Sequence, residues 1–403
     1  MSGPLAGVRV VDLSTMLMAP YATQILGDMG ADVIKVESPE GDPVRGIGPM
    51  RNPGMGTIFL QVNRSKRSVV LDLKSEAGHT ALLDIVASAD VFVTNLRPHA
   101  LRRLALDYGA VALHHPGIVY ASLFGYGQHG RHASKPAFDD LIQGAIGVPW
   151  LAHMADGSEP RYAPTAIVDR GVALWCVGQV CAALLHRART GQGQEIAIPM
   201  FEMMASFVLG DHLAGHAFEP PLGDMGYRRM LNPDRRPYRT ADGYVCVMIY
   251  TDRHWQSFFR ALGRAAEFER DQRYRSMTSR TEHIADIYRE LAELLLTRQT
   301  DEWLALFDAA DIPAMPLNTP EKLLNDPHLQ ETGFFSIEQH PSEGPLRSMA
   351  YPSTWSATQP GPTRHAPQLG EHTREVLGEL FYDSARIDAL VAAVAPSPAN
   401  RNG

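Results

Sequence analysis

The chain has 403 residues, enough for two domains, and a formal net charge of −8 at pH 7. This acidic balance excludes general nucleic-acid binding, which needs a basic surface. The three cysteines predict neither a disulfide nor a metal framework, since Cys176 and Cys181 lie in one apolar segment. No apolar run predicts a membrane span, and the N-terminus lacks the regions of a signal peptide, so we expect a cytoplasmic protein.

The first half of the chain alternates short apolar strands with helices. Strands separated by helices of this size predict parallel βαβ units, and therefore an α/β fold with a Rossmann-like large domain over residues 1–215. No G-x-G-x-x-G motif follows the first strand, so nicotinamide or flavin binding is not supported. The predicted strands cover 8–13, 31–37, 67–74, 91–95 and 118–127, and the predicted helices cover 20–30 and 76–89.

Asp169 stands where a polar loop gives way to an apolar segment that predicts a helix over 171–185. Gly191 and Gly193 end this helix, and residues 194–200 resume the alternation of a strand. We therefore expect Asp169 at or near the helix N-terminus, where backbone N–H groups and the helix dipole stabilise a negative charge. A carboxylate in this place is either an N-cap or a nucleophile.

The organisation changes after about residue 215, where a stretch rich in Pro, Gly and Arg is typical of a linker into a new unit. A strand is predicted over 243–251, followed by a helix with Trp255, Phe258 and Phe259 on one face. Two further helices and a return strand follow. This pattern predicts a small α/β domain over 220–320 and a C-terminal segment, 325–403, that returns to the large domain.

Eight segments carry a resemblance that covers essentially the whole chain. They are PLAGVRVVDLS, LGDMGADVIKVESPEGDPVR, NRSKRSVVLDLKSEAG, ADVFVTNLRPHALRRL, IVYASLFGYG, PAFDDLIQGAIG, RTGQGQEIAIPM and LGEHTREVL. In this order they are similar to the class III CoA-transferases, or CaiB/BaiF family, which includes formyl-CoA transferase, carnitine CoA-transferase and α-methylacyl-CoA racemase. The resemblance implies an interlocked homodimer in which each chain threads a ring made by the other.

The resemblance also implies a chemistry, because Asp169 matches the aspartate that family transferases use as a covalent nucleophile. Asp169 would attack an acyl-CoA thioester to form a mixed anhydride, and the released CoA would then form an aspartyl-CoA thioester. A carboxylic acid would accept the CoA. The implied substrates are therefore an acyl-CoA and a carboxylic acid, with coenzyme A present only as substrate, no tightly bound cofactor and no metal.

Phe138 separates two branches of this family. In the racemase branch this position holds a histidine that works with the aspartate as an acid/base pair, and an α-proton racemase needs two such groups. Phe138 carries no proton to exchange, so a CoA-transferase is favoured and an acyl-CoA racemase or isomerase is the alternative. A catalytically silent CoA-binding protein is disfavoured by the intact surroundings of Asp169.

Cations near the ends of the first-domain strands are candidates for the phosphates of CoA, because ligands of open α/β sheets bind there and Arg forks suit phosphate. They are Arg45, Arg64, Lys66, Arg67, Lys74, Arg97, Arg102 and Arg103. By resemblance, Leu71, Lys74, Asn95 and Arg103 match positions that contact CoA in formyl-CoA transferase. The predicted CoA site is Arg45, Leu71, Lys74, Asn95, Arg97 and Arg103.

The predicted substrate pocket contains Leu17, Phe138, Asp139, Arg228 and Arg229. Leu17 replaces a glutamine of formyl-CoA transferase, which disfavours oxalate or formyl-CoA as substrate. Asp139 either orients a substrate or stands in the first turn of a helix. The arginine-rich stretch 228–239 either holds a second carboxylate by bidentate pairing, which would make the acid a dicarboxylate, or forms a linker face or a dimer contact.

Overall fold

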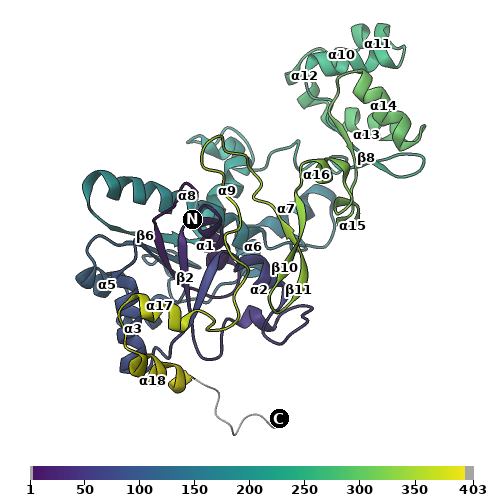
Figure 1. The fold of residues 1–403 in the computed structure, drawn as a ribbon. Coiled ribbons are helices and arrows are strands. Elements are labelled where there is room, and N and C mark those ends of the chain that lie inside the picture. The colour runs from purple at the N-terminus through teal and green to yellow at the C-terminus, as the bar shows by residue number, and fades with distance from the viewer. Residues whose placement is uncertain (1–2, 395–403) are drawn as a thin grey trace. The chain divides into compact units, whose positions relative to one another are not determined.

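The computed structural model describes residues 3–394 and divides them into two compact units (Figure 1). The large unit contains residues 3–146, 163–207 and 330–394, and the small unit contains Gly147–Tyr162 and Val208–Leu329. The segment 147–162 thus leaves the large unit and returns to it just before Asp169. This excursion is not visible in the sequence, where no change of composition marks either end.

A six-stranded parallel sheet forms the centre of the large unit. Its strands are β1 (Arg9–Leu13), β2 (Asp32–Glu37), β3 (Lys66–Val70), β4 (Val91–Thr94), β5 (Val119–Phe124) and β6 (Gln194–Pro199). They lie in the order β3-β2-β1-β4-β5-β6. Val11 of β1 lies opposite Ile34 of β2 on one side and opposite Phe92 of β4 on the other. This order is that of the Rossmann fold, so the predicted Rossmann-like sheet is confirmed.

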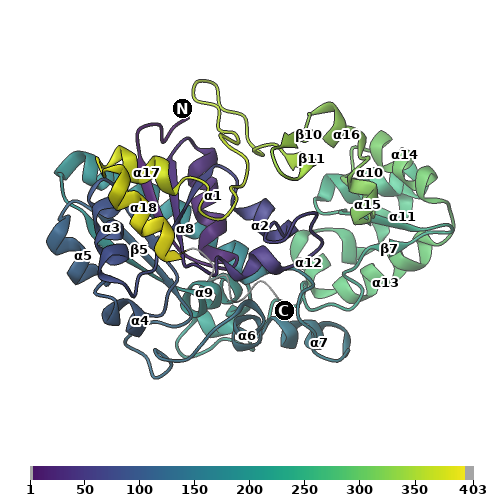
Figure 2. The ribbon, with the colours of Figure 1, turned by 60° about the horizontal axis from the view of Figure 1, so that its bottom comes forward.

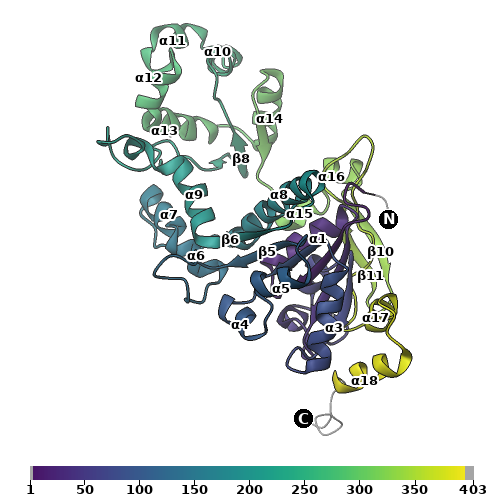
Figure 3. The ribbon, with the colours of Figure 1, turned by 90° about the vertical axis from the view of Figure 1, so that its left-hand side faces the viewer.

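Each face of the sheet has its own core, because alternate side chains of a strand point to opposite faces. Val10 packs with residues of α1 (Met18–Asp28) and α8 (Ile167–Thr190), which lie side by side in Figure 3. Val11 packs with residues of α3 (Glu76–Ala87) on the other face. The other helices that precede the C-terminal segment in the large unit are η1 (Pro43–Gly46), α2 (Thr57–Val62), α4 (Pro98–Arg103), α5 (Tyr108–His114), α6 (Asp139–Ala145) and α9 (Met200–His212). Helix α9 continues into the small unit.

The C-terminal segment returns to the sheet of the large unit (Figure 2). The hairpin of β10 (Phe335–His340) and β11 (Gly344–Met349) comes first, followed by α17 (Thr373–Glu379) and α18 (Ser384–Val394). The backbone N–H of His372 donates to the carbonyl of Ser68, and the backbone N–H of Val70 donates to the hydroxyl of Thr373. These hydrogen bonds fix the start of α17 beside β3. The sequence predicts a helical tail here, but not the antiparallel hairpin before it.

The small unit is built on an antiparallel sheet and an aromatic core. Its strands, in sheet order, are β7 (Tyr238–Arg239), β8 (Tyr244–Val247) and β9 (Ala314–Pro316). Phe307 stacks on Phe258 and Trp303 in the core, and Trp255 packs edge-on against Phe258, as the predicted apolar helix face requires. The helices of this unit are α7 (Val148–Asp156), η2 (Ala214–Ala217), α10 (Asp252–Ala261), α11 (Ala265–Arg270), η3 (Gln272–Tyr274), α12 (Met277–Glu282), α13 (Ile284–Leu295), α14 (Thr300–Ala309), α15 (Pro320–Leu323) and, at its end, α16 (Pro327–Glu331).

Helix α8 is longer than its sequence pattern predicts, and it is long and apolar enough to cross a membrane by length and composition alone. This corrects the expectation that no segment meets that test. Val172, Cys176 and Val180 of α8 are fully buried in the core shared with the sheet, and Asp169 and Arg170 stand in its first turn. The helix is therefore part of the core of the α/β unit.

Candidate active site

The loops that follow β1 and β4 meet at the carboxyl edge of the sheet, where the strand order reverses. In open α/β sheets this reversal creates the crevice that binds ligands. Asn95, directly after β4, accepts a hydrogen bond from Thr15 N (3.0 Å) and donates one to Thr15 O (2.7 Å). Both ends of its carboxamide are thus occupied in holding the β1 loop against the β4 loop.

The β1 loop is fixed further at Met16, whose φ of 71° lies in the left-handed region that L-residues rarely adopt. Asp42 accepts a hydrogen bond from Met16 N (3.0 Å) and forms a fully buried ion pair with Lys35 (2.8 Å). Lys35 also donates to Ser14 O (2.8 Å). The loop that leads into α1 is therefore held in one shape by buried side chains of β2 and of the loop that follows β2.

Asp169 is the third residue of α8, and Ala166 occupies the N-cap position. The structure therefore excludes the N-cap interpretation and leaves the carboxylate free for another role. The side chain is partly buried, and within residues 3–394 its oxygens take part in no hydrogen bond or ion pair. Such a carboxylate is available to react with a substrate.

Asp139 and Gln143 of α6 position the start of α8. Asp139 Oδ1 accepts a hydrogen bond from Asp169 N (2.8 Å), and its Oδ2 accepts one from Gln143 Nε2 (2.6 Å). Gln143, which is fully buried, also accepts a hydrogen bond from Ala163 N (2.8 Å). Asp139 thus stands in the first turn of α6 and also satisfies an N–H group that the helix α8 cannot pair itself. Gln143 has no sequence signal that marks it, because its backbone partner Ala163 lies twenty residues away.

The surroundings of Asp169 favour the protonated carboxyl. Burial, followed by the negative charge of Asp139, raises the pKa of Asp169 to about 7; Arg170 opposes this rise, and Asp140 adds to it. About half of the carboxyl groups would therefore be ionised at neutral pH. A group poised near the working pH in a ligand crevice is a candidate for catalysis.

The first turns of α1 and α8 lie next to each other. The guanidinium of Arg170 lies over the ring of Tyr21, with 4.6 Å between its central carbon and the ring centroid. Both helices begin at the carboxyl edge of the sheet, and Met18 and Val168 share one core cluster. Leu17, the N-cap of α1, is therefore placed near the start of α8.

Phe138 is the N-cap residue of α6, and 61% of its surface is exposed. Single exposed apolar side chains are common on protein surfaces, so this exposure alone does not mark a site. Its neighbour Asp139 contacts the backbone of Asp169. Phe138 therefore borders the start of α8, but it supplies no acid or base.

The predicted CoA residues follow the strands of the carboxyl edge. Leu71, which is buried, and Lys74, which is exposed, lie between β3 and α3. Arg97, the N-cap of α4, and Arg103, in its last turn, are both exposed. In the part of the chain that the structure describes, Lys74, Arg97 and Arg103 form no salt bridge, so their charges are available to an anion.

Arg45 differs from these cations. Its guanidinium forms a buried bidentate pair with Glu37 (2.7 Å to each oxygen) and donates to the carbonyl of Pro367. Two cations at the start of β3 are also paired: Arg64 forms a salt bridge with Asp28, and Lys66 forms one with Asp12. These contacts favour a structural role for Arg45.

The remaining predicted residues, Arg228 and Arg229, belong to the small unit. Arg229 lines a cavity of that unit, whereas Arg228 is exposed and is not among the residues that line it. In residues 3–394, no group of three or more His, Cys, Asp or Glu side chains is placed to hold a metal ion. The two units therefore each contribute predicted residues, and Asp139, Arg170 and Asp140, the charged neighbours of Asp169, belong to the large unit.

Comparison with known proteins identifies relatives over almost the full chain. The sequence model of CoA-transferase family III matches residues 5–373. The succinate–glutarate CoA-transferase of Agrobacterium fabrum is 30% identical over 94% of this chain and 96% of its own. The (R)-2-hydroxy-4-methylpentanoate CoA-transferase of Clostridioides difficile is 30% identical over 95% of this chain and 97% of its own. Among solved structures, a CaiB/BaiF family protein of Brucella suis has a TM-score of 0.79 at 30% identity and covers 94% of this chain and 100% of its own.

Proposed function

The chain belongs to CoA-transferase family III, and on this basis we propose that it moves CoA from an acyl-CoA to a carboxylic acid with Asp169 as covalent nucleophile. The observation that supports this role is the unpaired, partly buried carboxylate in the first turn of α8. Its N–H is held by Asp139, so the backbone is fixed while the side chain stays free. A nucleophile that must form and break bonds in each turnover needs both properties.

The proposed reaction proceeds through two kinds of covalent intermediate. An oxygen of Asp169 attacks the acyl-CoA carbonyl, the C–S bond breaks, and a mixed anhydride and CoA thiolate result. The thiolate then attacks the Asp169 carbonyl of the anhydride, which releases the donor acid and leaves an aspartyl-CoA thioester. The acceptor carboxylate attacks this thioester, forms a second anhydride, and the thiolate finally takes the acceptor acyl group. Asp169 is regenerated as a carboxylate.

The energy of the thioester is retained in each intermediate, so no step consumes ATP. Each tetrahedral intermediate carries a negative oxygen, which the positive end of the α8 dipole would stabilise. The raised pKa of Asp169 makes the reaction depend on pH, because only the ionised form attacks. The carboxylate is a better nucleophile at this pKa than at its ordinary value, since basicity and nucleophilicity rise together.

We place CoA at the carboxyl edge of the sheet. Lys74, Arg97 and Arg103 would bind its phosphates as exposed cations, and Leu71 and Asn95 would border it. Arg45 is left out of this proposal because Glu37 occupies its guanidinium. Coenzyme A would be present only as acyl-CoA and as the transient thioester.

Leu17, Phe138 and Asp139 would border the acyl end of the substrate. Leu17 and Phe138 make this end apolar, and Asp139 fixes the nucleophile. The relatives named above act on acids of different kinds, two dicarboxylates in one case and a hydroxy acid in the other. These comparisons alone therefore leave the class of acid open.

We also propose that the protein is an interlocked homodimer. Leu174, Trp175 and Leu185 on α8 are each more than half exposed, and together with the exposed Gly178 and Ala182 they form an apolar stripe along a central helix. An unsatisfied apolar stripe of this kind favours burial against another chain. Light scattering coupled to gel filtration tests this: a mass near twice 44.3 kDa is expected, and a monomer at micromolar concentration would refute it.

Intact-protein mass spectrometry tests the enzymatic proposal. Wild type and Asp169→Ala would be incubated with a panel of acyl-CoAs and quenched with acid, which preserves an aspartyl thioester or anhydride. We expect a CoA-sized or acyl-derived adduct on wild type and none on the variant, which would also identify the donor. If no donor gives an adduct and deuterium enters the α-position of an acyl-CoA instead, the protein is an isomerase or racemase.

A further inference from the structure

Arg170 carries a free positive charge beside the proposed nucleophile. It follows Asp169 in the first turn of α8, and its side chain is partly buried. Within residues 3–394 its guanidinium takes part in no hydrogen bond or ion pair, although polar groups that leave water usually find an acceptor in the protein. The covalent steps proposed above assign no role to this charge.

Tyr21 fixes the orientation of the Arg170 guanidinium. The central carbon of the guanidinium lies 4.6 Å from the centroid of the Tyr21 ring, and Tyr21 belongs to α1, which packs beside α8. Stacking on a ring uses one face of the planar guanidinium and leaves the N–H groups at its edge free. Both residues stand near the start of their helices, at the carboxyl edge of the sheet, so these N–H groups are available to a ligand of that edge.

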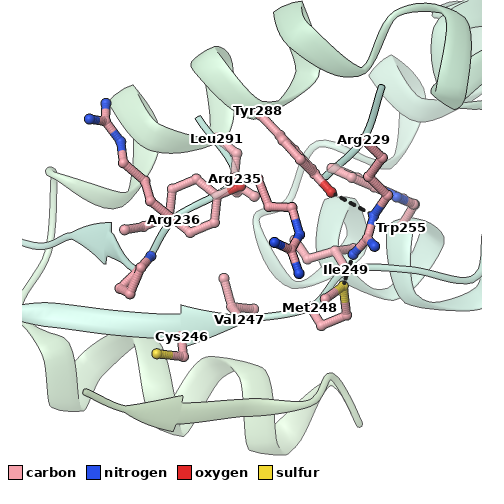
Figure 4. Close-up of a pocket in the computed structure, with 12 residues that line it drawn as sticks. Arg229, Arg235, Arg236, Cys246, Val247, Met248, Ile249, Trp255, Tyr288 and Leu291 are labelled. Atoms are coloured by element: carbon pink, nitrogen blue, oxygen red, sulfur yellow. Dashed lines mark hydrogen bonds between the residues drawn. The ribbon is translucent and has the colours of Figure 1, made fainter. Parts of the chain in front are cut away.

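Arg229 of the small unit shows the contrasting arrangement. Its guanidinium also lies over a ring, with 5.6 Å between its central carbon and the centroid of Tyr250. The N–H groups of Arg229, however, donate to the hydroxyl of Tyr288 (3.1 Å) and to the sulfur of Met248 (3.1 Å), as the dashed lines in Figure 4 show. Arg170 has the ring but no such acceptors in the described chain, so a ligand can supply them.

The charge of Arg170 acts on the carboxyl of Asp169. Burial raises the pKa of Asp169, the charges of Asp139 and Asp140 raise it further, and the charge of Arg170 lowers it. The guanidinium therefore lies within electrostatic reach of the group that reacts. An acid that approaches as its carboxylate would be repelled by Asp139 and Asp140, and it would need a cation in this place to bind.

Formation of the aspartyl-CoA thioester would change this balance of charge. The ionised carboxyl of Asp169 becomes a neutral thioester carbonyl, so one negative charge beside Arg170 disappears. Arg170 can then attract a second carboxylate at the stage when the acceptor acid must approach the thioester. In the free enzyme, by contrast, ionised Asp169 repels that acid.

We propose that Arg170 binds the reacting carboxylate of the acceptor acid, and that it binds this carboxylate more tightly once Asp169 is uncharged. The inference rests on the proposed function, because the aspartyl-CoA thioester is the uncharged form of Asp169 in turnover. A guanidinium holds the two oxygens of a carboxylate through parallel N–H groups, which leaves lone pairs on both oxygens to attack the neighbouring carbonyl. Recognition of this kind depends on the carboxylate and not on the rest of the acid.

Binding of an acid in the absence of acyl-CoA tests Arg170 apart from turnover. Asp169→Asn replaces the carboxylate with a neutral group of similar shape and so imitates the charge of the thioester. The probe is trifluorobutanoate, whose fluorine NMR line width reports weak binding, and the pH is 8, where most of the wild-type Asp169 is ionised. We expect Asp169→Asn to bind the probe at least about fivefold more tightly than wild type does. Adding Arg170→Gln to Asp169→Asn should weaken binding at least about tenfold.

Further variants separate the charge of Arg170 from its effect on folding. Arg189 is an exposed arginine in the last turn of the same helix, and Arg189→Gln should leave the affinity of Asp169→Asn unchanged. Tyr21→Leu removes the ring under the guanidinium and should weaken binding less than Arg170→Gln does. Circular dichroism checks that each variant folds, and Arg170→Lys, which keeps the charge without the fork, replaces Arg170→Gln if that variant does not fold.

Three results of this titration would overturn the proposal. The first is an Asp169→Asn protein that does not bind the probe, and the second is one that binds it no more tightly than wild type. The third is an equal effect of Arg170→Gln and Arg189→Gln on the affinity, because the loss would then reflect net charge and not a contact.

Turnover separates this proposal from the proposed function. If wild type forms the Asp169 adduct, Arg170→Gln should raise the KM for the acceptor acid at least about tenfold and change the KM for the acyl-CoA much less. A lower kcat with both KM values unchanged would refute the role of Arg170 and leave the nucleophile in place. Absence of any adduct on wild type would refute the covalent mechanism, whatever the affinity for the probe.

Discussion

The large unit contains two groups of buried or partly buried charges that differ in one respect, the presence of partners. In the first, around β1 to β3, Lys66 pairs with Asp12 (2.9 Å) and Lys35 with Asp42 (2.8 Å), all four side chains fully buried. Lys66 also donates to the carbonyl of Pro20 and to Asn63. In the second, the carboxylate of Asp169 forms no such contact in the described chain. The paired charges shape the sheet edge, and the unpaired one is free for chemistry.

This difference shows why burial of a charge does not by itself identify an active site. A buried ion pair with satisfied hydrogen bonds loses little relative to water, and its main effect is to fix geometry. A carboxylate without a partner responds to burial by a rise of its pKa, as Asp169 does. The paired charges fix the shape of the β1 loop, and the carboxylate of Asp169 is free to react with a substrate.

The largest expected effect is the loss of activity in Asp169→Asn. Removing the nucleophile should lower kcat by at least about 10⁴-fold.

The same change should raise stability above pH 7: the folded pKa of about 7 exceeds the ordinary value of 3.8, so stability falls as pH rises from about 4 to 7. We expect a gain of about 1–2 kcal/mol in urea unfolding at pH 8, after allowance for solvent screening. Lower stability of this variant at pH 8 would contradict the account.

Breaking the paired group should cost stability. Lys66→Ala leaves the carboxylate of Asp12 buried without its ammonium partner, and we expect a loss of about 3–5 kcal/mol in the free energy of unfolding. Arg374→Ala is the control, because its pair with Asp388 is exposed on both sides and should change stability by no more than about 1 kcal/mol. Equal effects of the two changes in urea unfolding would show that the buried pair has no special role.

A smaller effect should follow from the charge beside the nucleophile. Asp139→Asn keeps an oxygen that accepts the Asp169 N–H but removes the negative charge that helps to raise the pKa of Asp169. The rising limb of kcat/KM against pH, near 7 in wild type, should move down by up to about one unit. Asp140→Asn should move it less, since Asp140 is the weakest of the contributing charges. A larger shift for Asp140→Asn, or none for either, would show that these carboxylates do not tune Asp169.

Much of the fold could be predicted from the sequence because it depends on local patterns. The strands β1 to β6 and the central part of helix α8 follow from alternation, apolar runs and glycine stops. Helix α6 can be predicted only as one of two alternatives for Asp139, because its seven residues are too few to show a period. Strand β11 of the β10–β11 hairpin has polar and apolar residues on both faces, so the alternation of the hairpin is weak.

Pairing between distant residues could not be predicted. Arg45, Arg97 and Arg103 look alike in the sequence, yet only Arg45 meets a buried glutamate and loses its availability to a ligand. Asp139 reaches Asp169 across thirty residues, and Gln143 supports it from the next turn. A sequence lists the charged groups, and the fold decides which of them remain free.

Oxygen transfer into Asp169 tests the central claim most directly. In the proposed reaction, the acceptor acid leaves one of its carboxylate oxygens on Asp169 at each turnover. Wild-type protein would be turned over with acyl-CoA and an acceptor acid labelled with ¹⁸O in both carboxylate oxygens, then digested and analysed by mass spectrometry. We predict a gain of about 2 Da after one turnover, and of up to about 4 Da after many, on the peptide that contains Asp169 and on no other. CoA transfer without label in that peptide would contradict the covalent role of Asp169.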